Sequence, residues 1–214
     1  NLYKKGVNIS PLGFNADNTI AYVSSDIASK VPSIYAVDLA TLNTTLIHKE
    51  TVAEIGGTGR LYNGALEVVS FARDYNRMVF LSEDSEMKKI MMQMYATFGI
   101  DETSSDLLVT SFTKDGNKMV FKISSDRDPG VFYLFNRGLD GSKPSIRELA
   151  VAKREIDPNM MAKMTPIKFK ARDGLELRGY KVLPITGEAP YPLVQIIHGG
   201  PHGPRDYWGW NREA

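Results

Sequence analysis

The segment formed by His198, Gly199 and Gly200 is where residue types and spacing point most clearly to chemistry. It directly follows the apolar run 193–197, which predicts a strand in the interior of a sheet. Acyl transfer places negative charge on a former carbonyl oxygen, and backbone N–H groups about 3 Å away stabilise that charge. Because glycine has no Cβ, the main chain there can approach a substrate closely. The segment therefore predicts Gly199 and Gly200 as oxyanion-hole donors, with an ordinary glycine turn as the alternative.

The three histidines are the other candidates for a general base or a metal ligand. His198 and His202 are four residues apart, but glycine and proline separate them and no glutamate lies between, so the helical zinc-protease pattern is missing. His48 falls at the end of a predicted strand. Residues 57–62 lack the third glycine of a dinucleotide-binding loop, and the absence of cysteine removes thiolate ligands and nucleophiles. We therefore expect no catalytic histidine, no metal and no cofactor.

A complete hydrolytic triad is missing from the sequence. Hydrolases with an oxyanion loop of this kind carry their nucleophile on a Gly-x-Ser-x-Gly elbow, followed in the chain by an acid and a histidine. No such elbow occurs here, and fourteen residues follow Gly200. We therefore expect the chain to be a fragment that is inactive by itself. Trp208 and Trp210 could line a substrate cleft or pack in a core.

The elements that would position this segment begin with a repeated hairpin pattern. In three places a phenylalanine precedes an aspartate by three residues, and asparagine or glycine follows in the turn: Phe14 and Asp17, Phe71 and Asp74, Phe112 and Asp115. Asparagine and glycine tolerate the positive φ angles that tight turns need. The pattern predicts strand, turn and strand three times, with the three phenylalanines in equivalent strand positions.

Two of these hairpins are followed by a second pair of predicted strands. These are residues 33–38 with 44–48, and residues 130–135 with 145–149. Units of four antiparallel strands recurring at intervals of 41 and 57 residues are typical of β-propeller blades, although unrelated hairpins in a β-sandwich are the alternative. About three blades cannot close a ring, since propellers carry ~4 to 8. The predicted fold class is mainly β, beginning with a partial β-propeller of four-stranded antiparallel blades.

One stretch interrupts the β pattern. Its apolar residues follow the helical period: Met87, Ile90, Met91, Met94, Tyr95 and Phe98. Ser85 can cap the N-terminus and Gly99 can end the helix, which predicts an inserted helix over residues 86–98. The methionine stripe could bind a partner, but packing against its own domain is the commoner role.

A boundary is predicted between Ala150 and Thr165. Asp157 and Pro158 break the strand pattern, and residues 160–164 could form a short helical connector. Beyond it, residues 167–171 and 175–183 predict another hairpin around Asp173 and Gly174.

Several motifs occur in order along the second half of the chain: Ala171-Arg172-Asp173-Gly174, Gly179-Tyr180, Leu183-Pro184, Tyr191-Pro192-Leu193-Val194 and His198-Gly199-Gly200-Pro201-His202. Together they resemble the start of the catalytic domain in the prolyl oligopeptidase family of serine peptidases, especially its dipeptidyl-aminopeptidase and acylaminoacyl-peptidase branch. Residues 124–134 are similar to the last propeller blade of those enzymes. The resemblance covers at least residues 109–210.

The resemblance implies a β-propeller capping an α/β-hydrolase domain, with peptide substrates entering between the two. Residues 1–160 would be the C-terminal blades of the propeller, and residues 161–214 the first strands of the α/β-hydrolase domain. The intact protein would hydrolyse peptides through an acyl-enzyme, with the Ser, Asp and His of the triad outside this chain. A non-catalytic propeller that binds peptides or proteins is the alternative function.

The composition is that of an ordinary globular protein. Hydrophobic residues make up 43% and charged residues 24% of the chain, and the net charge is +1. This balance provides no basic surface for a nucleic acid, and no apolar run reaches the ~18 to 20 residues of a membrane span. Unpaired strand edges make self-association a possibility. The sequence leaves a cytoplasmic and a periplasmic location equally open.

Overall fold

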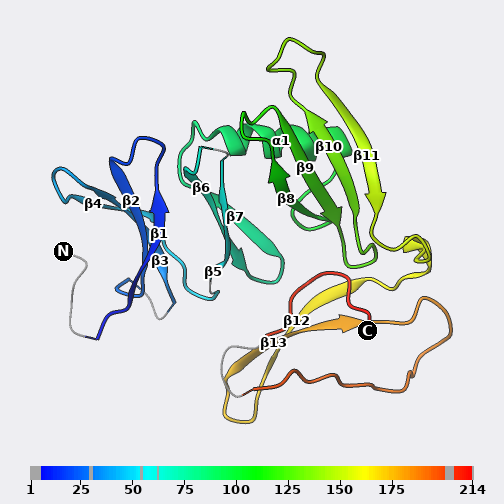
Figure 1. Ribbon diagram of the computed structural model, residues 1–214. Coiled ribbons are helices and arrows are strands. Elements are labelled where there is room, and N and C mark those ends of the chain that lie inside the picture. The colour runs from blue at the N-terminus through cyan, green and yellow to red at the C-terminus, as the bar shows by residue number, and fades with distance from the viewer. Residues whose placement is uncertain (1–5, 29–30, 54, 62, 201–204, 214) are drawn as a thin grey trace.

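The computed structural model describes residues 6–28, 31–53, 55–61, 63–200 and 205–213, and it is mainly β (Figure 1). Three antiparallel sheets lie side by side in chain order, and a separate hairpin lies beneath the second and third of them in this view. The predicted mainly β fold class is therefore confirmed. In the part of the chain that is described, no helix has the length and apolar character to cross a membrane.

The first sheet has four strands, and each pairs with the next along the chain: β1 (Ile9–Phe14), β2 (Ile20–Ser25), β3 (Ser33–Asp38) and β4 (Thr44–His48). The third sheet repeats this order with β8 (Asp106–Phe112), β9 (Lys118–Ser124), β10 (Val131–Asn136) and β11 (Ser145–Val151). The second pair of strands predicted in each unit is present in both sheets. The four-stranded prediction holds for these two units.

The middle sheet differs from the other two. It has three strands, β5 (Ile55–Arg60), β6 (Leu66–Ala72) and β7 (Asn76–Phe80), and α1 (Glu86–Phe98) follows them. The helix has the predicted bounds and caps. The Ser85 hydroxyl oxygen accepts a hydrogen bond from the backbone N–H of Lys88 at 3.0 Å, and Gly99 ends the helix at φ +63°.

Two apolar cores lie on opposite faces of the middle sheet. Val69 and Phe71 pack with Tyr22 and Ile34 of the first sheet. Val68 faces the other way and packs with the buried residues of α1 and of the third sheet: Met87, Ile90, Met91, Met94, Leu107, Met119, Phe121 and Phe135. Neighbouring residues of a strand point to opposite faces, so β6 contributes to both cores. The methionine stripe of α1 is therefore core, not a free binding face.

The three repeated phenylalanines all lie near the end of the strand that enters a hairpin turn, as predicted. Phe14 and Phe112 end the first strand of a four-stranded sheet and are 47% and 38% exposed. Phe71 lies on the central strand of its sheet and is 1% exposed. Their predicted equivalence is therefore wrong beyond the hairpin itself, because the middle sheet is covered by a neighbour on each side.

The predicted boundary region contains no strand between Val151 and Met164. It holds one short 3₁₀ helix, η1 (Pro158–Met160), capped by the side chain of Asp157. The hairpin predicted after the boundary follows as β12 (Met164–Lys170) and β13 (Glu176–Val182), and Gly174 has φ +86° in its turn. The hairpin is confirmed. The helical connector predicted at residues 160–164 is wrong, because the short helix ends at Met160 and Met164 already pairs with Val182 as the first residue of β12.

The predicted interior strand at residues 193–197 is wrong for this structure. The segment has no strand partner among the described residues, and Leu193 and Ile197 are 91% and 75% exposed. It runs as a long loop below the β12–β13 hairpin in Figure 1. An interior strand needs hydrogen-bonded neighbours on both edges, and its apolar sequence alone cannot provide them.

Candidate active site

The predicted oxyanion segment lies on the surface. His198, Gly199 and Gly200 are all exposed, and Nδ1 of His198 lies 2.9 Å from Oδ2 of Asp206. A carboxylate can only accept a hydrogen bond, so Nδ1 carries the proton, and Nε2 of a neutral His198 is left as an acceptor. His202 lies outside the described residues.

Nothing in the described structure requires glycine at positions 199 and 200. Neither φ lies in the left-handed region, and a Cβ added at either position would meet no atom within 4 Å. Among the described residues, no hydrogen-bond acceptor pairs with the N–H of Gly199 or Gly200. Both groups therefore remain available to an acceptor from outside the described chain.

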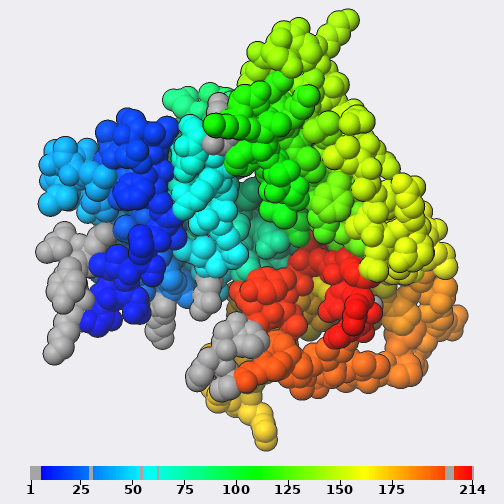
Figure 2. All heavy atoms as spheres, viewed as in Figure 1, coloured from blue at the N-terminus to red at the C-terminus, as the bar shows by residue number. Residues whose placement is uncertain are grey.

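The residues that follow this segment are held against the middle sheet. Trp208 is 5% exposed, its indole N–H donates to the carbonyl of Met164 at 3.1 Å, and its ring lies 5.3 Å from that of Tyr75. Arg205 donates to the carbonyl of Arg73 at 3.5 Å. Figure 2 shows these C-terminal residues, in red, filling the space between the sheets and the orange loop. Of the two roles predicted for Trp208, packing is the one observed.

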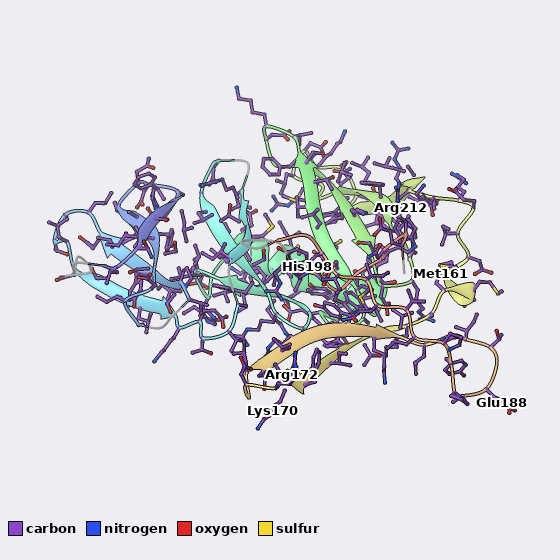
Figure 3. All side chains as sticks on the ribbon, turned by 90° about the horizontal axis from the view of Figure 1, so that it is seen from below. Met161, Lys170, Arg172, Glu188, His198 and Arg212 are labelled. Carbon is purple, nitrogen blue, oxygen red and sulfur yellow. The ribbon has the colours of Figure 1, made fainter. Side chains whose placement is uncertain are left out.

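Strand β13 also contacts the turn between β6 and β7, to which Arg73 and Tyr75 belong. The hydroxyl of Tyr180 lies 3.2 Å from the carbonyl oxygen of Arg73 and 3.0 Å from that of Asp74, so its proton is shared between them. Arg178 pairs with the Asp74 carboxylate at 2.9 Å, and Lys168 lies 3.6 Å from it. Burial raises the pKa of Tyr180, which keeps this hydroxyl a donor at neutral pH. Figure 3 shows that the cations Lys170 and Arg172 lie at the turn end of this hairpin.

The Arg73 side chain continues the network into the interior. Its Nε and one terminal nitrogen donate to the same oxygen of Glu50, at 3.2 and 2.8 Å, and Glu50 is fully buried. The other Glu50 oxygen accepts from the backbone N–H groups of Thr51 and Val52. Burial alone would raise the pKa of Glu50, but these hydrogen bonds outweigh it and lower the pKa to about 2. Glu50 is therefore a buried anion, with His48 3.4 Å away.

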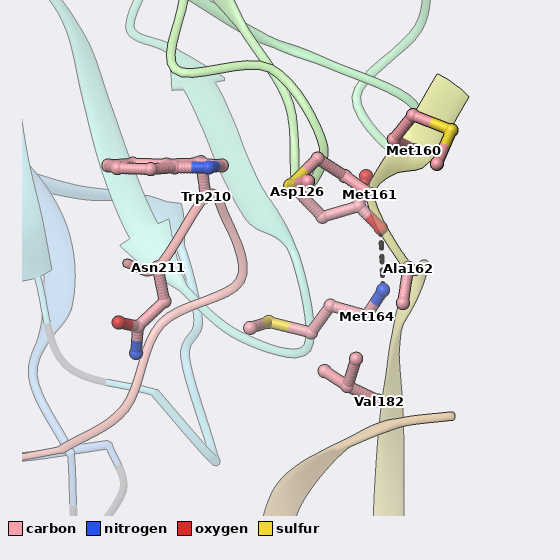
Figure 4. A pocket seen from close by; sticks show the side chains of 8 residues that line it. All are labelled: Asp126, Met160, Met161, Ala162, Met164, Val182, Trp210 and Asn211. Carbon is pink, nitrogen blue, oxygen red and sulfur yellow. Dashed lines mark hydrogen bonds between the residues drawn. The ribbon is translucent and has the colours of Figure 1, made fainter. Parts of the chain in front are cut away.

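A cavity of about 190 Å³ lies where the connector, the third sheet and the C-terminal residues meet (Figure 4). Its lining is mostly apolar: Met160, Met161, Ala162, Met164, Val182 and Trp210, with Asp126 and Asn211. Asp126 accepts a hydrogen bond from the backbone N–H of Met164 at 2.7 Å, which ties the connector to the third sheet. Trp210 therefore lines a cavity, and its role in a substrate cleft stays a prediction. In the described ranges, no group of three or more residues is arranged to hold a metal ion.

Comparison with known proteins places these features in context. No family model matches the chain. Dipeptidyl aminopeptidase BIII from Pseudoxanthomonas mexicana is 25% identical over 210 residues, which is 94% of this chain and 29% of that protein. The chain resembles the dipeptidyl-aminopeptidase branch of the prolyl oligopeptidase family. This peptidase-like chain spans less than a third of the length of that relative.

Solved structures of prolyl oligopeptidases also match parts of the peptidase-like chain. Prolyl oligopeptidase B from Galerina marginata in its apo form is 11% identical, with a TM-score of 0.45 over 83% of this chain and 24% of that one. A structure from a study of two prolyl endopeptidases is 14% identical, with a TM-score of 0.48 over 84% of this chain and 25% of that one.

Sequence reasoning missed the network around the β6–β7 turn of this peptidase-like chain. Glu50 and Arg73 are 23 residues apart, and Tyr180 and Asp74 are 106 apart, so no local pattern joins them. One signal was present. Tyr75 follows Asp74 where the other two hairpins have Asn18 or Gly116, and a large aromatic residue in a turn indicates packing against another element.

Proposed function

We propose that this chain is part of a serine peptidase, in which residues 1–160 form propeller blades and residues 161–214 begin the α/β-hydrolase domain. The sequence match to a dipeptidyl aminopeptidase along 94% of the chain supports this proposal. So does the repeated order of four antiparallel strands in the first and third sheets, which is the order found in a propeller blade.

The observation that carries the proposal is the pair Gly199 and Gly200. The described chain gives no steric or conformational reason for glycine at either position, and the two N–H groups donate to no acceptor among the described residues. A close approach by another molecule explains both facts, because a Cβ would stand between the amide and a substrate. We assign the N–H groups to the oxyanion of a tetrahedral intermediate.

The reaction would be acyl transfer. A serine hydroxyl, supplied by the hydrolase domain outside this chain, attacks the carbonyl carbon of a peptide and loses its proton to a histidine. The carbonyl oxygen becomes negative and accepts hydrogen bonds from the glycine N–H groups. The amine product leaves with the proton, and water then hydrolyses the acyl-enzyme. His198 is not assigned as the base, because it directly precedes Gly199 and Gly200 in the oxyanion segment, whereas hydrolases of this kind carry the catalytic histidine after the nucleophile in the chain.

The experiment uses the full-length protein encoded by the gene and a fluorogenic dipeptidyl amide. Gly200→Pro removes the N–H, and we expect kcat to fall by about 10²- to 10³-fold. Gly200→Ala is the comparison variant, because it keeps the N–H and its Cβ enters open space in the structure, so the chain still folds. A smaller loss of kcat for Gly200→Ala than for Gly200→Pro separates the lost donor from the steric effect of a Cβ beside the substrate. We expect the 214-residue chain alone to show no turnover and no labelling by a fluorophosphonate.

The result that would refute the peptidase is a full-length protein that neither cleaves such amides nor reacts with the fluorophosphonate. That outcome would leave the non-catalytic propeller, whose peptide binding can be measured by calorimetry.

We also propose that residues 193–197, which lack a strand partner among the described residues, let two copies of the isolated chain pair. Light scattering of the chain with and without a Val194→Pro substitution tests this pairing.

A further inference from the structure

The turn between β6 and β7 makes contacts that the corresponding turns of the other two hairpins do not make. We propose that this turn, Arg73 to Tyr75, is the seat that positions the Gly199–Gly200 segment, and that buried Glu50 is a remote positioning residue that holds the seat. The effect of the seat on turnover rests on the proposed peptidase function, whereas the seat itself does not.

The first observation is an internal comparison of the three hairpins. Asp17 accepts a hydrogen bond from the backbone N–H of Thr19, and Asp115 accepts one from that of Asn117. Each of these aspartates thus stabilises its own turn. Asp74 accepts no hydrogen bond from its own turn within the described residues, and its carboxylate is turned toward Lys168 and Arg178 of the β12–β13 hairpin.

The second observation is that residues before and after the glycine segment in the chain contact this one turn. On the N-terminal side, Tyr180 shares its hydroxyl proton between the carbonyls of Arg73 and Asp74. On the C-terminal side, Arg205 donates to the Arg73 carbonyl, and the Trp208 ring packs against Tyr75. The loop from Tyr180 to Arg205, which carries the glycine segment, is thus anchored at both ends to one turn and has fewer accessible positions than a free loop.

The third observation is the set of hydrogen bonds that holds the turn in place. The Arg73 guanidinium donates twice to one oxygen of fully buried Glu50, and the second Glu50 oxygen is held by the N–H groups of Thr51 and Val52. Charge-assisted hydrogen bonds of this kind are strong and directional. Because Glu50 follows β4 of the first sheet, the orientation of the turn is linked to that sheet. The chain of contacts thus runs from Glu50 through Arg73 to Tyr180 and Arg205.

The test uses the 214-residue chain and the fluorescence of Trp208. Trp210→Phe leaves Trp208 as the one remaining tryptophan, because the sequence contains two. Trp208 is buried at the seat, so acrylamide quenches it poorly as long as the seat is occupied. In this background we expect Glu50→Gln and Tyr180→Phe each to raise the quenching constant about twofold or more, with far-UV circular dichroism unchanged.

Glu83→Gln is the matched control, because Glu83 also pairs with a cation, Lys88, but is exposed, and neither residue of that pair belongs to the seat. We expect its quenching constant to equal that of the parent. If Glu50 acts through the seat, the double variant Glu50→Gln and Tyr180→Phe changes quenching by less than the sum of the single changes. Additive effects, or a folded Glu50→Gln chain with unchanged quenching, would overturn the proposal.

Two further variants keep the proposal testable if Glu50→Gln does not fold. Arg73→Lys retains the charge but loses one of the paired donors, and Asp74→Asn removes the attraction to Lys168 and Arg178. We expect both to raise quenching of Trp208, and protected Trp208 in both would refute the seat. In the full-length protein, Tyr180→Phe is expected to lower kcat about tenfold to a hundredfold with KM unchanged. If no peptidase activity exists, the quenching results still decide whether the seat does.

Discussion

Replacing Glu50 by glutamine tests the electrostatics of the buried network directly. The substitution keeps the size of the side chain but removes its charge, so Arg73 loses an anionic partner that is 0% exposed. The pKa of Glu50 is lowered from its ordinary value of 4.5 to about 2. A shift of this size corresponds to about 3 kcal/mol of stability when the carboxylate is ionised.

The pH dependence follows from the direction of the shift. A carboxyl with a lowered pKa stabilises the folded state fully above its unfolded pKa of 4.5, and this contribution is lost as pH falls toward about 2. At pH 7 we expect Glu50→Gln to lower the free energy of unfolding by about 3 kcal/mol, within the range for breaking a buried ion pair. Between pH 5 and pH 3 the difference from the parent chain should shrink.

Urea unfolding followed by circular dichroism at pH 7, 5 and 3.5 measures both effects. Glu83→Gln serves as the control, because the Glu83 side chain is 94% exposed and solvent screens its pairing with Lys88. The reasoning is refuted if Glu50→Gln is as stable as the parent at pH 7. It is equally refuted if the loss of stability is the same at every pH, since that would make it a packing effect.

Three further substitutions test the helix and its ends by the same urea titration, and a fourth, Gly200→Ala, is a control. Met94→Ala should cost about 2 to 5 kcal/mol, because Met94 is 1% exposed in the core between α1 and the third sheet; a loss below 1 kcal/mol would contradict that packing. Ser85→Ala should cost about 1 to 2 kcal/mol, since it removes the N-cap and the donor to Glu67, and no change would mean that the cap is not formed in solution. Gly99→Ala should lower the free energy of unfolding by more than about 1 kcal/mol, because Gly99 has φ +63°. Gly200→Ala should leave it unchanged, because the φ of Gly200 is not left-handed. Equal effects of the two substitutions would be inconsistent with these backbone conformations.

Short-range information was enough to predict the hairpins and the helix. The Asp17 and Asp115 turns are built from bonds within a few residues, and α1 is set by its apolar period and by the caps at Ser85 and Gly99. These interactions join residues that are close together in the sequence. For that reason the strands 33–38 and 44–48 and the helix 86–98 were predicted with the bounds observed.

Long-range information was missing where the predictions failed. The apolar run 193–197 looks like an interior strand, but a strand forms only when neighbours supply hydrogen bonds to its edges. The candidate site was predicted only as far as its glycine segment. The contacts that hold this segment, in which Tyr180 and Glu50 both bind Arg73, depend on how distant elements pack together. No spacing of neighbouring residues predicts them.

The two cores on opposite faces of β6 affect which sheets can unfold locally. Each outer sheet packs apolar side chains against the middle sheet. The three sheets therefore form a row in which each is stabilised by its nearest neighbours. Opening an outer sheet exposes one core, whereas opening the middle sheet exposes both. Amide hydrogens of β6 should therefore exchange only in the rarest fluctuations, and those of β1 and β11 in more frequent, smaller ones. The seat on the β6–β7 turn is thus built on the slowest-exchanging part of the row.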